Sequence, residues 1–291
     1  MWLVVGANGQ LGRSMTELLE SNTTDYVALS RHQLDITDSV AVENVFEELR
    51  PTIVLNAAAW TAVDDAEGHE VAALRVNAQG PANLAKSTSM VGAQLVQIST
   101  DYVFDGQANV PYTVTSPTEP MNAYGRTKLA GENAIREFQN GNSCIVRTAW
   151  LYSEYGKNFA KTMTVKALRG EAVRVVDDQL GQPTSAHDVA QLILDISRLK
   201  EMPPIAHGTN SGQATWFQFA QEIYSQLGAD PALVSPVDTS AFPTVAKRPA
   251  YSVLDHSDFP AWGLQPMQNW QVGLSDSIES IRMAIQKESS L

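Results

Sequence analysis

The chain has 291 residues, of which 44% are hydrophobic and 18% are charged, enough for one large α/β domain or a cofactor domain with a smaller lobe. Its formal net charge of −12 argues against nucleic acid, and against an anionic membrane, as the main partner. No apolar run approaches the roughly 20 residues of a membrane span, the N-terminus leaves no room for a signal peptide, and the single Cys144 excludes an internal disulfide, so we expect a cytoplasmic protein.

A glycine-rich turn follows the first apolar run. Residues 2–5 read as a strand, and the apolar positions of residues 11–19 share one face of a helix. The turn between them, G-A-N-G-Q-L-G, suits a dinucleotide: its first glycine allows a tight turn, the second a close pyrophosphate, and the third helix–strand packing. The helix N-terminus adds free N–H groups and partial positive charge. We therefore assign this turn to cofactor binding, with candidates Gly6, Gly9, Gln10, Leu11 and Gly12.

The second strand, predicted over residues 26–29, ends at Ser30 and Arg31. An acidic residue here would bind the ribose 2′-hydroxyl, whereas an arginine accommodates a 2′-phosphate. The sequence therefore favours NADPH, with NADH as the alternative. Asp35 and Ile36 lie where related proteins cover the adenine, and Thr37 or Asp38 is expected to cap the next helix.

Three further strand–helix units complete the first half of the chain. The third strand, residues 53–55, ends in Asn56 and three small residues that let a cofactor pass close by, Ala57, Ala58 and Ala59. A helix is expected over residues 70–90, a fourth strand over 95–98 and a fifth at 145–147. This alternation predicts an α/β fold, a Rossmann-type doubly wound parallel sheet with a smaller C-terminal substrate-binding lobe.

The chain divides near Trp150 in this interpretation. Residues 1–150 form the dinucleotide-binding domain, and residues 151–291 mainly form the substrate-binding lobe, with part of the chain returning to the sheet. The second half shows a strand at 173–176 and three helices, whose expected N-caps are Ser185, Thr215 and Ser275.

A hydroxyl, a phenol and an ammonium form the candidate catalytic group. Thr100 stands at the end of the fourth strand, and Tyr124 and Lys128 share one helix face because they are four residues apart. A phenol is a poor acid–base group at neutral pH, so we expect the ammonium and the oxidised nicotinamide to bring the Tyr124 pKa down. Thr100 would hold the substrate oxygen. Tyr124 and Lys128 also count among the expected cofactor contacts.

Seven stretches resemble the dTDP-4-dehydrorhamnose reductase family, within the extended short-chain dehydrogenase/reductase superfamily. They are G-A-N-G-Q-L-G at Gly6, A-A-A-W-T-A-V-D at Ala57, S-T-D-Y-V-F-D-G at Ser99, Y-G-R-T-K at Tyr124, R-T-A-W-L-Y at Arg147, D-D-Q-L-G-Q-P-T at Asp177 and R-P-A-Y-S-V-L-D at Arg248. The resemblance implies NADPH-dependent reduction of the C4 ketone of dTDP-6-deoxy-L-lyxo-4-hexulose to dTDP-L-rhamnose. It implies a catalytic triad of Thr100, Tyr124 and Lys128, and a sugar-nucleotide site that includes Val63, Thr100, Tyr102, Trp150, Gln182 and Arg248.

Two departures keep alternatives open. Trp60 stands where the family usually has tyrosine, and Tyr251 where it usually has asparagine, so a ketoreductase for another dTDP-deoxysugar is the first alternative. The second is a non-catalytic, NADP-binding regulatory subunit resembling the β subunit of methionine adenosyltransferase, since fold does not fix function.

We expect no metal site, because the five histidines are scattered and show no ligand spacing. Acidic pairs such as Asp64-Asp65 and Asp177-Asp178 are interpreted as caps or solvated turns. The expected partner is a small nucleotide-sugar substrate; whether the chain is a monomer or a homodimer stays open.

Overall fold

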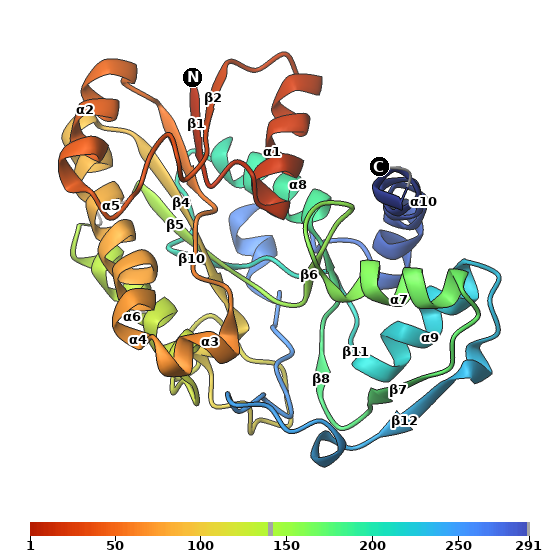
Figure 1. Ribbon diagram of the computed structural model, residues 1–291. Helices are drawn as coiled ribbons and strands as arrows, with labels where there is room; N and C mark the ends of the chain where they lie inside the picture. Colours follow the sequence, from red (N-terminus) through yellow and green to blue (C-terminus); the bar gives the residue numbers. More distant parts are fainter. Residues whose placement is uncertain (139–141, 290–291) are drawn as a thin grey trace.

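The computed structural model describes residues 1–138 and 142–289 and has a six-stranded parallel sheet at its centre (Figure 1). The strand order is β10-β5-β4-β3-β1-β2, so the chain winds outward from β1 in both directions. This is a doubly wound, Rossmann-type arrangement, and the predicted fold class is confirmed. The strands are β1 (Trp2–Val5), β2 (Tyr26–Leu29), β3 (Ile53–Asn56), β4 (Gln94–Thr100), β5 (Ser143–Thr148) and β10 (Ile205–His207).

The central strands are apolar on both faces because helices cover both. In β1, Trp2 and Val4 belong to one hydrophobic cluster, whereas Leu3 and Val5 belong to another on the opposite face. Successive side chains of a strand point to opposite faces, so a continuous apolar run suits a strand buried on both sides.

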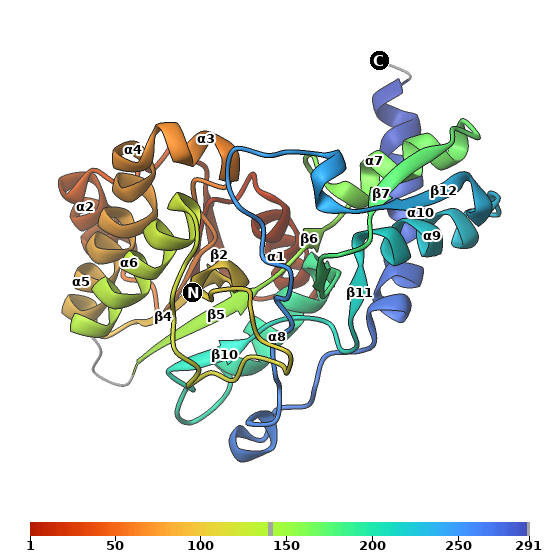
Figure 2. The same ribbon diagram turned by 90° about the horizontal axis from the view of Figure 1, so that it is seen from below.

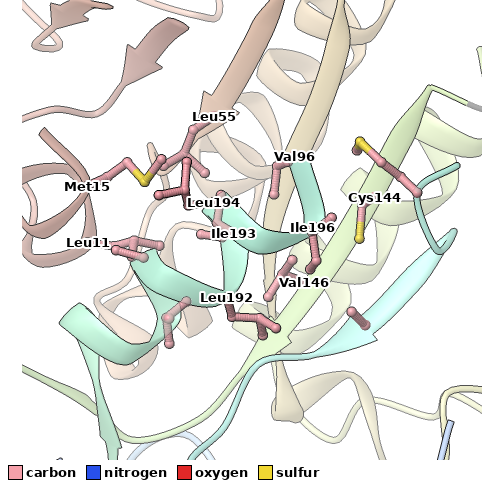
Figure 3. Packing of buried hydrophobic residues seen from close by; sticks show 14 of the residues in the cluster. Leu11, Met15, Leu55, Val96, Cys144, Val146, Leu192, Ile193, Leu194 and Ile196 are labelled. Carbon is pink, nitrogen blue, oxygen red and sulfur yellow. The ribbon is translucent and has the colours of Figure 1, made fainter. Parts of the chain in front are cut away.

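Helices α1 (Gln10–Ser21) and α8 (Ala186–Ser197) cover one face of the sheet, and α2 (Ser39–Leu49), α5 (Gly80–Val91) and α6 (Ala123–Glu137) cover the other (Figure 1). Figure 3 shows Leu11 and Met15 of α1 and Ile193 of α8 in one cluster with Leu55 and Val96 of the sheet. The side chains from α8 show that residues after 150 contribute to the Rossmann core.

The region predicted as one helix over 70–90 is three consecutive segments. They are α4 (Glu70–Leu74), a π-helical segment (Arg75–Gln79) and α5, which ends at Gly92 in the left-handed region with φ of 72°. A short helix, α3 (Val63–Gly68), precedes them and packs on α6. Single π-turns inside helices often accompany functional sites.

A second lobe follows the fifth strand (Figure 2). Its core joins three helices through Met163, Phe219, Ile223, Leu274 and Ile281. Its helices are α7 (Phe159–Leu168), α9 (Trp216–Gln226) and α10 (Trp270–Ser289). Its strands are β6 (Leu151–Tyr152), β7 (Val173–Val176), β8 (Leu180–Gly181), β9 (Thr184–Ser185), β11 (Ala214–Thr215) and β12 (Val234–Val237).

The predicted helix caps have mixed outcomes. Thr215 caps α9 in a capping box with Gln218, and Asp38 caps α2, accepting from the backbone N–H groups of residues 40 and 41. The prediction for Ser275 is wrong, because α10 already begins at Trp270. Asn269 precedes that start, and its side chain accepts from the Gln271 N–H at 2.9 Å.

Among the residues that the structure describes, no helix is both long enough and apolar enough to cross a bilayer.

Candidate active site

The glycine turn after β1 is packed too tightly for side chains. Gly6 has φ of +79°, and a Cβ there would lie 2.5 Å from the Ala58 nitrogen. A Cβ on Gly12 would lie 2.4 Å from the Gly6 carbonyl oxygen. Gly9 is the N-cap of α1, no side chain caps it, and the first turn carries no acidic residue. The turn therefore offers backbone N–H groups to an anion, as a pyrophosphate site requires.

A cavity of about 230 Å³ opens beside this turn, at the carboxyl ends of β1 and β3 where the winding of the sheet reverses. Most predicted cofactor residues line it: Gly6, Gly9, Arg31, Asp35, Ile36, Ala57, Ala58 and Ala59. Four further lining residues are not among the predicted ones, namely Asn8, Leu34, Trp60 and Val76. Asn8 and Leu34 adjoin predicted positions and could have been found, whereas Val76 comes from the π-helical segment, which the sequence did not reveal.

Four other predicted cofactor residues are not among those that line the cavity. Leu11 and Gly12 are buried in the helix–sheet contact. The Gln10 side chain accepts from Asn158 Nδ2 at 2.8 Å and so ties α1 to the second lobe. The Ser30 hydroxyl donates to Gln33 Oε1 at 2.8 Å.

Asp35 is held as a carboxylate at the end of the cavity that Arg31 also lines. It accepts from the backbone N–H of Thr37 at 2.9 Å and from the Thr37 hydroxyl at 2.8 Å, and these bonds, with the Arg31 charge, lower its pKa. Among the described residues that line this cavity, Arg31 is the one with a cationic side chain.

Thr100 and Tyr124 meet where β4 ends against the first turn of α6. Burial, together with the neighbouring Asp101 charge, raises the Tyr124 pKa strongly, and the Thr100 hydroxyl lies close enough to Tyr124 to oppose that rise. The edge of the Tyr102 ring packs on Tyr124, with ring centres 5.8 Å apart. From the sequence we expect a lowered Tyr124 pKa; in the chain itself burial dominates and the Tyr124 pKa is raised.

Lys128 lies one turn further along α6 and is 3% exposed. Its ammonium donates to the Ile98 carbonyl at 2.6 Å, two residues before Thr100. Burial lowers its pKa to about 8, and the charge of Glu132 opposes that change. The group can therefore act as a cation at neutral pH while remaining close to its titration range.

A buried ion pair anchors α6 below these residues. Glu132 accepts from Arg147 of β5 at 2.7 and 3.0 Å, and its Oε1 also accepts from the Ser99 hydroxyl at 2.6 Å. Tyr124, Lys128 and Glu132 are spaced by four residues and so lie along one side of the helix. The ion pair and the Ser99 bond therefore join α6 to β4 and β5, next to Thr100 and on the helix that carries Tyr124 and Lys128.

The Arg248 segment lies beside the candidate triad. Arg248 forms an ion pair with Asp64 at 2.7 Å, and Asp64 follows Val63 at the start of α3. The Arg248 charge opposes the rise in the Tyr102 pKa that burial causes. Asp64 was interpreted as a cap or solvated turn; this contact corrects that interpretation.

Trp150 follows β5 with φ of +45°, a rare backbone conformation for a large side chain. Its ring stacks on Trp216 with centres 3.6 Å apart and packs against Gly181. Trp216, at the start of α9, was not predicted as a site residue.

The Gln182 amide is engaged within the protein. Its oxygen accepts from the Thr209 hydroxyl at 2.9 Å and from the Leu254 N–H at 2.8 Å, and its nitrogen donates to the Leu254 carbonyl at 3.3 Å. It therefore braces two segments of the second lobe, a role that the sequence did not indicate.

Within the described residues, Glu17, Glu154 and His187 place potential ligand atoms within 4.8 Å of one another, and His187 pairs with Glu154 at 2.9 Å. The expectation of no metal site stays a prediction.

Comparisons with known proteins agree along the whole chain. The family model described as RmlD substrate binding domain matches residues 1–283. The dTDP-4-dehydrorhamnose reductase of Streptomyces griseus is 46% identical, covering 96% of this chain and 93% of the relative. The dTDP-4-keto-6-deoxy-D-glucose reductase of Streptomyces niveus is 44% identical over 95% of this chain and 96% of its own. The crystal structure of dTDP-4-dehydrorhamnose reductase from Bacillus anthracis in complex with NADP has a TM-score of 0.92 and 38% identity, covering 96% of this chain and 98% of that one.

Proposed function

Because the chain belongs to the RmlD substrate binding domain family, we propose that it reduces the C4 ketone of dTDP-6-deoxy-L-lyxo-4-hexulose with NADPH and yields dTDP-L-rhamnose. The chain is an oxidoreductase that acts on dTDP-keto-sugars; the particular sugar is the proposal. The observation that carries it is the meeting of Thr100, at the end of β4, and Tyr124, in the first turn of α6.

The cavity beside β1 fits a dinucleotide. Side chains are excluded at Gly6 and Gly12, so a pyrophosphate could approach the backbone there, and the Ala57–Ala59 segment leaves room beside it. Arg31 would contact a 2′-phosphate, which favours NADPH over NADH. NADPH, when bound, supplies a hydride for a carbonyl carbon.

Tyr124 would donate the proton. Its pKa is raised by burial, so the phenol keeps its proton at neutral pH and can give it to an oxygen that develops negative charge during reduction. Thr100 would hold that oxygen. Lys128 would hold the cofactor ribose and stabilise the Tyr124 phenolate once the proton has left.

The second lobe, mainly residues 151–291, would hold the nucleotide sugar. Arg248 suits a diphosphate because a guanidinium can bind phosphate oxygens in a bidentate manner. Trp150, fixed by its stack on Trp216, offers a flat apolar face, while Val63 and Tyr102 would border the sugar from the Rossmann side.

A second candidate is reduction of another dTDP-deoxysugar. The Streptomyces niveus relative, at 44% identity, is nearly as similar as the Streptomyces griseus relative at 46%. Trp60 and Tyr251 are the two positions at which the resemblance drawn from the sequence leaves the sugar open. Both candidates use the same catalytic group and differ in the sugar that the second lobe accepts.

The deciding experiment follows the absorbance of reduced nicotinamide with purified protein and enzymatically prepared dTDP-6-deoxy-L-lyxo-4-hexulose. NADPH and NADH are supplied in parallel, and the product is identified by mass and NMR. Rapid loss that requires both protein and keto-sugar, with dTDP-L-rhamnose as product, would support the proposal. Turnover of dTDP-4-keto-6-deoxy-D-glucose alone would support the second candidate.

A further inference from the structure

Asp101 places a buried carboxyl directly against Thr100. It is 3% exposed, and its Oδ1 accepts from the Thr100 hydroxyl at 2.8 Å. Its Oδ2 is buried and receives no hydrogen bond of ordinary geometry from the described residues, although the Ser252 hydroxyl lies close enough to lower the pKa of the carboxyl. A carboxylate in such a place lacks the hydration it has in water, which makes its protonated form more accessible.

The elements packed around Asp101 supply no compensating cation among the groups that influence it. Thr100 and Tyr102 flank it in the chain, Tyr124 faces it from α6, and Ser252 faces it from the segment after Arg248. Burial is the largest influence and raises the Asp101 pKa to about 6. Bound anions, such as a substrate diphosphate, would raise it further.

The Thr100 hydroxyl has a single hydrogen to give. Its oxygen already accepts from the Tyr102 N–H at 3.2 Å, and its hydrogen is directed to Asp101. While Asp101 is a carboxylate, that hydrogen is unavailable to Tyr124 or to a substrate oxygen. A protonated Asp101 would instead donate to Thr100 and free the Thr100 hydrogen to point toward the phenol.

We propose that Asp101 is a positioning residue that acts through Thr100. As a carboxylate, Asp101 accepts the hydrogen of the Thr100 hydroxyl. In its protonated form, Asp101 donates to that hydroxyl instead, so that Thr100 can donate toward Tyr124 and the substrate. This inference rests on the proposed reduction.

The proposed series of proton transfers is balanced. The reduced substrate oxygen takes the proton of Tyr124, the phenolate takes the proton of Thr100, and Thr100 takes the proton of Asp101. One O–H bond forms and one breaks at each transfer, no oxidation state changes along the chain, and Asp101 regains its proton from water.

The close approach that this requires is built into α6. A Cβ on Gly125 would lie 2.1 Å from the Tyr102 carbonyl oxygen, so α6 rests directly on the backbone that follows Asp101. The Asn122 side chain caps this turn by accepting from the Gly125 N–H at 2.8 Å. Tyr124 is therefore held against Thr100 by backbone packing, whatever the protonation state of Asp101.

The kinetic test is the pH profile of kcat in Asp101→Asn. The wild type should lose activity by about tenfold per pH unit above the Asp101 pKa in the complex. Asparagine donates to Thr100 at every pH, so this declining limb of the pH profile should be absent in Asp101→Asn. A second declining limb, from the loss of the Lys128 proton at higher pH, should remain. Ser252→Ala should move the limb to higher pH, because it removes a group that lowers the Asp101 pKa. Asp105→Asn, the same change four residues along, should keep the limb. A limb unchanged in Asp101→Asn would overturn the proposal.

A spectroscopic test needs no turnover. In protein labelled with 13C at tyrosine Cζ, the Tyr124 resonance, assigned with Tyr124→Phe, should show an inflection near the Asp101 pKa that is absent in Asp101→Asn. Thr100→Ala should remove most of that inflection, because the coupling runs through its hydroxyl. An undiminished inflection in Thr100→Ala would mean a direct charge effect and would overturn the proposal. If the wild type reduces no dTDP-keto-sugar, the proposed function fails, while these spectra still decide the role of Asp101.

Discussion

The guanidinium of Arg248 lies 2.7 Å from the Asp64 carboxylate, although the two residues are 184 positions apart. The other Asp64 oxygen accepts from the Ala246 N–H at 3.0 Å. One side chain at the start of α3 therefore holds both the backbone and the charged end of the segment proposed to bind the substrate diphosphate.

Replacing Asp64 by asparagine should raise KM for the dTDP-keto-sugar by about three- to tenfold with little change in kcat, because a misplaced guanidinium loses bidentate phosphate geometry. Arg248→Ala should raise KM by about tenfold or more, since the charged contact itself is lost. Steady-state kinetics at saturating NADPH measures both. Asp65→Asn is the matched control, because that carboxylate pairs with the exposed His69 at 3.0 Å. Equal KM values for Asp64→Asn and wild type would contradict the positioning role.

Tyr124→Phe should lower kcat by about 10²- to 10⁴-fold, the usual contribution of a positioned proton donor. NADPH binding, followed by fluorescence titration, should be unchanged, because the ring and its contact with Tyr102 remain. Tyr152→Phe removes a buried hydroxyl of the second lobe and serves as the control. A near-normal rate in Tyr124→Phe would rule out the assigned role.

Gly125→Ala should cost about 1–3 kcal/mol in free energy of unfolding, because its Cβ would lie 2.1 Å from the Tyr102 carbonyl oxygen and would force α6 away. The same shift should lower kcat by separating Tyr124 from Thr100. Gly68→Ala is the control: it also sits in a helix, but its Cβ would meet nothing within 4 Å. Urea unfolding and kinetics on both variants give the comparison, and equal stability of the two would contradict this packing.

The sheet and the cofactor turn could be predicted because their signals are local. Val54 and Leu55 of β3 are neighbours in the chain yet belong to opposite hydrophobic clusters, so a short continuous apolar run marks a strand covered on both faces. The glycine turn can be recognised in the sequence for a similar reason, since only glycine fits the contacts at Gly6 and Gly12.

The contacts around the catalytic candidates could not be predicted, because they join segments that are distant in sequence. Nothing near Asp64 indicates a partner at Arg248, and nothing in the S-T-D-Y stretch shows that Asp101 is buried while Asp105 accepts a hydrogen bond from Tyr112. The start of α10 was misplaced for a local reason: Ser275 is an attractive cap, but Asn269 is an equally good one nine residues before the first isoleucine of the helix.

Glu132→Gln should lower the free energy of unfolding by about 3–5 kcal/mol, because it leaves the Arg147 guanidinium buried without a carboxylate. The exposed pair between Lys86 and Glu43 provides the control, and Glu43→Gln should change stability by less than about 1 kcal/mol. Urea unfolding at neutral pH measures both. A cost in Glu132→Gln no larger than in Glu43→Gln would show that the buried pair does not anchor α6.

Lys128 should make stability rise with pH on the alkaline side. Its pKa is lowered from 10.5 to about 8 in the folded chain by burial, so between these values the unfolded chain binds more protons than the folded one. Stability attributable to this group should therefore increase as pH rises from about 8 to 10.5, by up to about 3 kcal/mol at about 1.36 kcal/mol per pKa unit. Below pH 8 both states carry the proton, and the full cost of burying the ammonium is present.

The measurement is the free energy of unfolding of wild type and Lys128→Met at pH 7.5 and pH 10. The variant should be relatively more stable at pH 7.5, with the gap narrowing at pH 10, because methionine carries no charge to bury. Lys86→Met removes the same charge from an exposed side chain and corrects for the change in net charge. A gap that stays constant, or that widens with pH, would mean that the Lys128 ammonium is stabilised by its bond to the Ile98 carbonyl and by Glu132 more than burial destabilises it.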